Sequence, residues 1–274
     1  MWKSPKKVIT EDRTAQLVAA AFVVLVVWWF VLQLIGSAAI SERRNLVWAA
    51  SYQIVAIFGG VFGIAISRSW GGFKSVMGRA IVFFSLGLLF QAFGQTAFSF
   101  YNLALKVDVP YPSVADIGFF GSVPFYIVGI LLLARASGVN ISLRSFASQL
   151  QAIVIPLIVV SASYALFLRG YKFEESAPLK VLLDFGYPLG QAVYVSIALL
   201  TYILSRSILG GVMRDRVLFI LVALVVQYFA DFNFLFQALN ETWQNGGYGD
   251  LIYLLAYLFM TLGLLRLQVR YIQA

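Results

Sequence analysis

The sequence predicts an all-α membrane protein of about eight transmembrane helices that form one domain, residues 1–274. Of its residues, 61% are hydrophobic and only 12% are charged, and the mean hydropathy is +0.86. Soluble domains contain about 45–50% apolar and about 25% charged residues. Stretches of about 20 apolar residues, enough to cross about 30 Å of hydrocarbon, recur along the whole chain. We therefore expect lipid to solvate much of the surface.

Short links rich in turn-forming residues separate the apolar segments. The predicted spans are Ala15–Gly36, Leu46–Ser67, Val76–Leu103, Ser113–Arg135, Phe146–Leu168, Leu179–Arg206, Arg216–Leu239 and Tyr248–Val269. The first span follows three lysines and is longer than the apolar core of a signal peptide, which is about 7–15 residues. We expect it to be retained as a helix.

The distribution of Lys and Arg predicts the orientation. If the N-terminus is cytoplasmic, the cytoplasmic segments contain 14 of the 20 basic residues and the external loops contain 6. Because cytoplasmic loops carry an excess of Lys and Arg, we expect both termini in the cytoplasm. The same rule accounts for the net charge of +8, and we expect no nucleic-acid partner.

An internal repeat emerges when the halves are compared. ISRSWGG begins at Ile66 and LSRSILGG at Leu204, and each precedes a long apolar span. The two spans then align so that Gln91 matches Gln227. The offset is about four helices, which predicts a parallel 4+4 duplication of residues 15–135 and 146–269. The alternative is chance similarity between two Phe-rich helices.

Two pairs of polar residues interrupt these aligned spans. Gln91 and Gln95 are four residues apart, as are Gln227 and Asp231, so each pair shares one helix face. Polar side chains in a membrane usually face the bundle interior because lipid cannot solvate them. They can line a ligand-binding cavity, or they can form hydrogen bonds that hold the helices together.

Three aspartates lie near the starts of even-numbered spans: Asp116, Asp184 and Asp250. An acid in the first turn of a helix can cap free backbone N–H groups, and Ser113 with Asp116 resembles a capping box. Asp184 lies deeper in its span, so capping explains it less well. Tyr187 and Gln191 follow it on one helical stripe. A second stripe contains Asp250, Tyr253 and Tyr257.

Glycines and prolines within the spans are interpreted as structural. Gly59 and Gly63 form a GxxxG pattern that allows close helix packing. Pro124, Pro156 and Pro188 fall inside spans, where proline interrupts helical hydrogen bonding.

The composition excludes several chemistries. The chain contains no Cys and no His, so it has no thiolate nucleophile, no Cys/His zinc site and no His-ligated haem. No Walker loop, GxSxG or HExxH motif is present. We expect no cofactor and no metal, and catalysis would have to depend on aspartates alone.

Three stretches carry a resemblance to a known family. Pro110, Pro112, Ser113 and Asp116 match a first element, Asp184, Tyr187, Pro188 and Gly190 match a second, and Gly246 or Gly247 with Asp250 matches a third. In this order they resemble the multi-helix N-terminal membrane module that precedes GGDEF and EAL domains in bacterial cyclic-di-GMP signalling proteins. In the second element, Gln191 stands where an aspartate is common. The chain has no GGDEF, EAL or kinase sequence, so the resemblance implies a sensory module of a bacterial inner membrane without cyclase activity.

The leading hypothesis is a sensory or regulatory module without catalytic turnover. It would bind a small or lipidic ligand in an outward-facing polar pocket and signal through a cytoplasmic partner, surrounded by membrane lipids and either alone or as a homo-oligomer. The alternatives are a small-solute transporter or channel, and an Asp-dependent intramembrane enzyme. The candidate ligand-binding residues are Gln91, Gln95, Asp116, Asp184, Tyr187, Gln191, Gln227, Asp231 and Asp250.

Overall fold

The computed structural model describes residues 13–34, 38–139, 145–168, 177–205, 211–240 and 242–268. Over these ranges the chain is helical and contains no strand. Eight helices among the described residues are long and apolar enough to cross a membrane. The predicted all-α class and the predicted number of spans are therefore confirmed at the level of helices.

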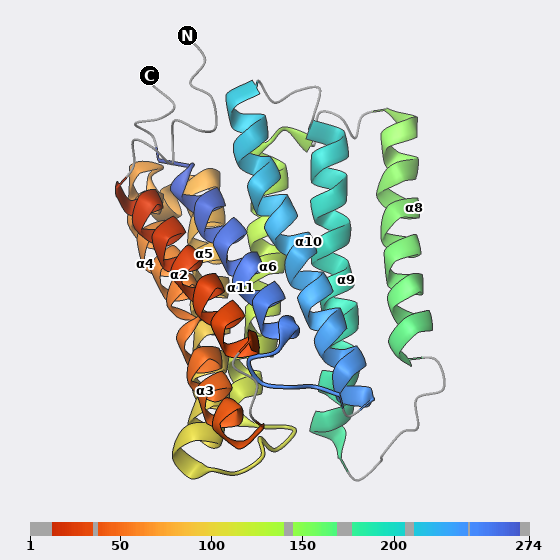
Figure 1. Ribbon diagram of the computed structural model, residues 1–274. Helices are drawn as coiled ribbons and strands as arrows, with labels where there is room; N and C mark the ends of the chain where they lie inside the picture. The colour runs from red at the N-terminus through yellow and green to blue at the C-terminus, as the bar shows by residue number, and fades with distance from the viewer. Residues whose placement is uncertain are drawn as a thin grey trace.

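The helices lie side by side along one common direction (Figure 1). Their bounds are α2 Arg13–Leu34, α3 Ala38–Ser51, α4 Ile54–Ser69, α5 Val76–Phe100, α6 Val114–Ala136, α8 Phe146–Ser163, α9 Pro178–Ser205, α10 Gly211–Leu239 and α11 Tyr248–Leu265. Short π-helical turns, Tyr101–Leu105 and Tyr164–Leu168, follow α5 and α8. The three prolines expected inside spans lie inside α6, α8 and α9.

Two predicted links are helical instead. The link expected before Leu46 forms most of α3, which begins at Ala38 and is separated from α4 by a break at Tyr52 and Gln53. Residues 38–51 contain no Gly or Pro and several strong helix formers such as Ala, Glu and Arg, so polarity alone did not end the helix. Likewise α10 begins at Gly211 rather than at Arg216.

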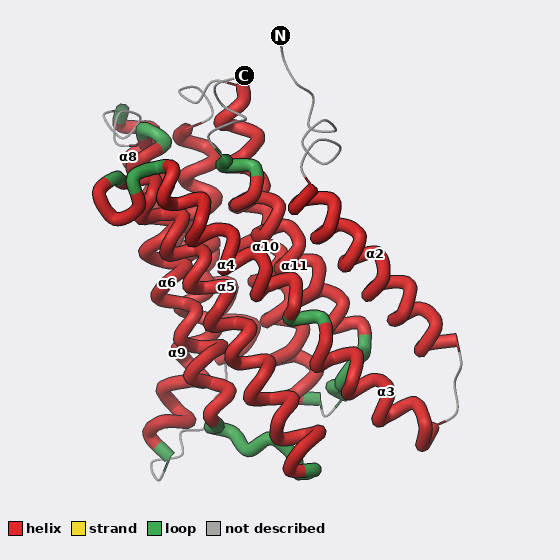
Figure 2. The backbone as a smooth tube through the Cα atoms, turned by 90° about the vertical axis from the view of Figure 1, so that its left-hand side faces the viewer, coloured by secondary structure: helices red, strands yellow, loops and turns green. Residues whose placement is uncertain are grey.

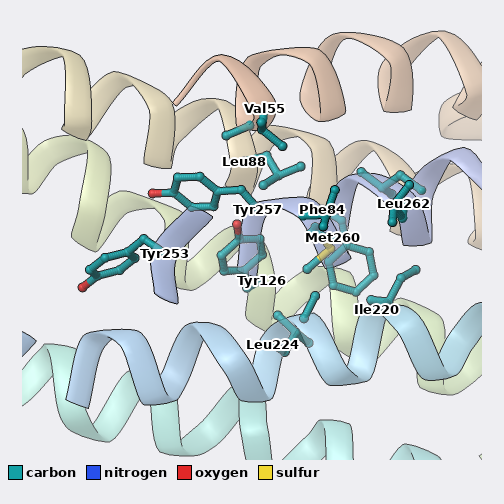
Figure 3. Packing of buried hydrophobic residues seen from close by; sticks show 14 of the residues in the cluster. Val55, Phe84, Leu88, Tyr126, Ile220, Leu224, Tyr253, Tyr257, Met260 and Leu262 are labelled. Atoms are coloured by element: carbon teal, nitrogen blue, oxygen red, sulfur yellow. The ribbon is translucent and has the colours of Figure 1, made fainter. Parts of the chain in front are cut away.

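Six helices form a closed ring in which α4, α5, α6, α9, α10 and α11 each pack against the next, and α11 packs against α4. Helix α2 lies outside this ring against α11 and α4, and α8 lies against α9. Figure 2 shows α2 and α3 on one side of the bundle. Side chains such as Phe84, Leu88, Ile220 and Leu224 fill the centre of the core (Figure 3).

Close packing joins α4 to its two neighbours. A Cβ atom added to Gly59 would collide with Thr261 of α11 and would lie 2.8 Å from Leu88 of α5. One added to Gly63 would collide with Ser85 and lie 3.0 Å from Leu264. The GxxxG pattern thus lies at a contact between three helices, as expected for a packing motif.

The two ends of the bundle differ. The start of α2 and the end of α11 lie at the same end (Figure 1), which we call the proximal end. The opposite, distal end holds α3, the segment between α5 and α6, and the start of α11. An even number of spans accounts for this arrangement.

Candidate functional site

Tyrosines and aspartates from several ring helices gather between the distal end and the middle of the bundle. We call this group the tyrosine–aspartate cluster and define it as Tyr52, Tyr126, Tyr187, Tyr194, Tyr253, Tyr257, Asp116, Asp231 and Asp250. Tyr52 lies at the break between α3 and α4, and the other members come from α6, α9, α10 and α11.

Asp250 performs two tasks with its two oxygens. Its Oδ2 accepts a 2.6 Å hydrogen bond from the backbone N–H of Gly246, just before α11. Its Oδ1 accepts a 2.9 Å hydrogen bond from the hydroxyl of Tyr52. The side chain is only 3% exposed. Asp250 therefore holds the segment that precedes the N-cap residue of α11, Gly247, and also fixes α11 to the start of α4.

Asp116 repeats this arrangement at the start of α6. Its Oδ2 accepts a 2.7 Å hydrogen bond from the backbone N–H of Ser113, and its Oδ1 accepts one of 2.8 Å from the hydroxyl of Tyr187 on α9. The Ser113–Asp116 capping box is confirmed. Capping and a bond to another helix coexist in one carboxylate.

Asp231 lies at the centre of the cluster. Its oxygens accept hydrogen bonds from the hydroxyl of Tyr253 at 2.7 Å and from Nε2 of Gln227 at 3.0 Å. One carboxylate on α10 thus binds a tyrosine of α11 and a glutamine of its own helix.

The glutamines of α5 bind neighbouring helices. Gln91 accepts a 3.1 Å hydrogen bond from the Tyr257 hydroxyl and donates one of 2.8 Å to Ser122. Gln95 donates to the backbone carbonyl of Ala49 at 2.9 Å. Both side chains are buried. For this pair the geometry supports the simpler interpretation, that they hold the bundle together.

The remaining predicted residues divide into two groups. Gln191 and Gln227 are buried in the bundle. Asp184 is half-buried, and its carboxylate accepts a 2.8 Å hydrogen bond from the hydroxyl of Tyr111 in the segment between α5 and α6. Asp184 therefore binds that connecting segment.

Aromatic rings connect the polar groups. The ring centroids of Tyr52 and Tyr257 are 5.9 Å apart, and those of Tyr253 and Tyr257 are 6.4 Å apart. Tyr126 and Tyr194 meet edge to face at 5.9 Å. Tyr126, Tyr253 and Tyr257 are drawn with their hydroxyls in Figure 3. The carboxylates thus lie among packed tyrosine rings.

One buried hydroxyl has no partner. Tyr194 is 1% exposed, and its hydroxyl forms no hydrogen bond in the described structure. Most buried polar atoms are satisfied, so such an exception calls for an explanation.

Sequence reasoning missed Tyr52, Tyr126 and Ser122. The internal alignment contained a signal for the first, because it pairs the second span with the sixth and so brings Tyr52 close to the position of Tyr187. Nothing local distinguishes Tyr126 from a tyrosine that anchors a helix at a membrane interface.

The chemistry available here is hydrogen bonding and electrostatics. Within the described residues, no group of three or more Asp, Glu, His or Cys side chains is placed to hold a metal ion. Each of the three cluster carboxylates is bound by hydroxyl, amide or backbone N–H donors. Comparison of the chain with protein-family models, with curated proteins and with solved structures finds no match.

Proposed function

We propose that the chain is a multi-pass sensory or regulatory module of a bacterial inner membrane, with both termini in the cytoplasm. It binds a small or lipidic ligand at the tyrosine–aspartate cluster and signals through a cytoplasmic partner. The observation that carries this proposal is the position of α11, which connects the polar distal half to the proximal end.

Helix α11 is held distally by two hydrogen bonds to other parts of the bundle. Asp250 accepts from Tyr52, and Tyr253 donates to Asp231 of α10. Both bonds involve charged or chargeable groups, which makes them stronger than neutral bonds. A ligand that competes for either carboxylate would break one of these two bonds, and α11 could then move relative to α4 or to α10.

The proximal end of α11 is held by different contacts. Arg266 lies 3.7 Å above the ring of Phe219 on α10, and the Trp70 indole donates a 2.6 Å hydrogen bond to the carbonyl of Leu267. A displacement of α11 would therefore alter contacts at the proximal end, where a partner can detect it. A differential affinity of about 1–3 kcal/mol between two states is sufficient for such coupling.

The proposed 4+4 duplication gains support from the cluster. In the ring, α4, α5 and α6 are followed by α9, α10 and α11 in the same sequential order. The Tyr52–Asp250 bond connects the first helix of one set to the third helix of the other, and the Tyr187–Asp116 bond makes the reciprocal connection. A rotation about an axis along the bundle would exchange the two bonds.

The alternatives are a transporter and an intramembrane enzyme. One experiment distinguishes both from a sensory module. The full chain is reconstituted into sealed liposomes with candidate solutes and lipids, alongside Asp231→Asn and Asp184→Asn. Solute uptake or lipid conversion that these changes abolish would overturn the sensory proposal. Binding that Asp231→Asn removes, without flux or product, would support it.

A direct readout of signalling uses the absence of native cysteine. Spin labels at Phe73→Cys and Gln268→Cys report the distance between the α4–α5 link and the end of α11. Tyr52→Phe, about one bundle length away, should change this distance distribution. An unchanged distribution would indicate that the two ends are not coupled through α11.

A further inference from the structure

In the part of the chain that the structure describes, neutral donors form the hydrogen bonds to the cluster carboxylates. No Lys or Arg occurs in residues 80–105, 107–134, 181–205 or 217–265, which include the cluster positions of α6, α9, α10 and α11. Yet the chain as a whole carries +8. The helical segments that carry Asp116, Asp231 and Asp250 are thus acidic within a basic protein.

Asp231 has capacity for another partner. A carboxylate offers about four lone-pair positions, and Asp231 receives two hydrogen bonds, from Tyr253 and Gln227. Its side chain is half-buried, whereas Gln227 one turn earlier is buried. It lies about 12 Å along α10 from the end of that helix, from a rise of about 1.5 Å per residue.

Tyr194 supplies an independent indication of a ligand. Its buried hydroxyl has no protein partner in the described structure, and its helix, α9, packs against α10, which carries Asp231. A ligand that donates hydrogen bonds would satisfy both the Tyr194 oxygen and the free lone pairs of Asp231.

The rings around these atoms narrow the chemistry further. Tyr126 meets Tyr194 edge to face, and Tyr257 contacts both Tyr52 and Tyr253. Aromatic faces attract cations, most strongly where water is excluded, and cages of such rings bind alkylated ammonium groups. An anionic ligand would meet carboxylates and no basic side chain from residues 107–134, 181–205 or 217–265.

We propose that the cluster binds an organic ammonium group between Asp231 and the Tyr194 hydroxyl, with the tyrosine rings as its walls. The ammonium supplies a positive charge that the helical segments carrying Asp116, Asp231 and Asp250 lack. It is carried either by a free amine or by a lipid headgroup. This inference depends on the proposed function only for its site, and it assigns the chemical class of the ligand.

The test measures binding to the purified full chain by isothermal titration calorimetry. The probes are ethanolamine, choline and 3,3-dimethylbutan-1-ol, which has the shape of choline without its charge. We expect choline or ethanolamine to bind at least about tenfold more tightly than the neutral isostere. Equal binding of the neutral isostere, or tighter binding of inorganic phosphate, would overturn the inference.

Three variants keep the test interpretable. Asp231→Asn should weaken ammonium binding about tenfold or more, and Asp108→Asn, in an exposed segment, should leave it unchanged. Tyr194→Phe removes a hydroxyl that has no partner, so the free protein should keep its thermal midpoint while ethanolamine binding weakens. If Tyr194→Phe lowers the midpoint and leaves binding unchanged, the hydroxyl has a structural role and the inference is wrong.

Nanodiscs distinguish the two sources of ammonium. If a headgroup is the ligand, choline should bind more weakly in discs that contain phosphatidylethanolamine than in discs of phosphatidylglycerol alone. If a free amine is the ligand, the affinities should agree. Ammonium binding accompanied by choline uptake into liposomes would overturn the sensory proposal while leaving this inference intact. Tight binding of only the neutral probe would overturn this inference while leaving the sensory proposal intact.

Discussion

The hydroxyl of Tyr52 donates a 2.9 Å hydrogen bond to the carboxylate of Asp250, although 198 positions separate the two residues in the sequence. The bond lies in the buried interior and connects the break between α3 and α4 with the first turn of α11. Its counterpart, from Tyr187 to Asp116, spans 71 positions and connects α9 with α6. These two bonds give the most direct tests of the architecture.

Tyr52→Phe should destabilise the bundle by about 1.5–3 kcal/mol, because it removes a buried hydrogen bond to a carboxylate without changing the ring. The measurement is the free energy of unfolding in detergent, followed by circular dichroism. Tyr248→Phe is the matched control, since Tyr248 begins α11, the helix of Asp250, and is 56% exposed. We expect that change to stay within about 0.5 kcal/mol. Equal effects of the two variants would contradict the assigned bond.

Gly59→Ala should destabilise by about 1–3 kcal/mol, because the added methyl group collides with Thr261 in a tightly packed contact. Ala65→Leu, on an exposed position of the same helix, is the control and should be nearly neutral. Adding Thr261→Ala makes room for the methyl group. In a double-mutant cycle the pair should therefore cost less than the sum of the single changes; simple additivity would show that the two side chains do not meet.

Topology can be tested with single cysteines in this cysteine-free chain. Phe73 is 68% exposed in the link between α4 and α5, on the predicted cytoplasmic side. Asp108 is exposed in the segment between α5 and α6, at the opposite end. In intact cells, a membrane-impermeant maleimide should label Asp108→Cys and should leave Phe73→Cys unlabelled until the cells are lysed. The reverse pattern would invert the predicted orientation.

Separate expression of the two halves tests the duplication. Residues 1–140 and 141–274 each contain one proposed repeat, and the contacts of α4 with α11 and of α6 with α9 connect them. The coexpressed fragments should therefore copurify. A cut within α5, after Ser85, divides a repeat and should not yield a complex. Fragments that fold but never associate would argue against a ring built from two equivalent halves.

Hydrophobic patterning was sufficient to predict the helices, because a span of apolar residues can satisfy its backbone in lipid in few ways. The spans starting at Val76 and Tyr248 begin at those residues in the structure. The start of α3 was missed because Glu42, Arg43 and Arg44 suggest a loop by charge, whereas their helix propensity is high.

The site could be predicted only in part. Single acids and amides within apolar spans are conspicuous, and Gln91, Gln95, Gln191, Gln227 and Asp250 are indeed buried. The tyrosines of the site are not conspicuous in the sequence. Tyr52 and Tyr126 resemble ordinary interfacial tyrosines until the helices are placed next to one another. Which hydroxyl reaches which carboxylate depends on the order of helices around the ring, and a single sequence does not contain that order.

Hydrogen bonds between early and late parts of the chain have a consequence for biosynthesis. Trp29 and Gln33 of α2 both donate to the carbonyl of Gly246, and Trp70 donates to Leu267. A ribosome makes these acceptors about 200 residues after their donors. In the membrane protein proposed above, the early helices would enter the bilayer before these acceptors exist, with their donors unpaired. The ring would close only when α11 is inserted, so that step would distinguish a finished molecule from an unfinished one.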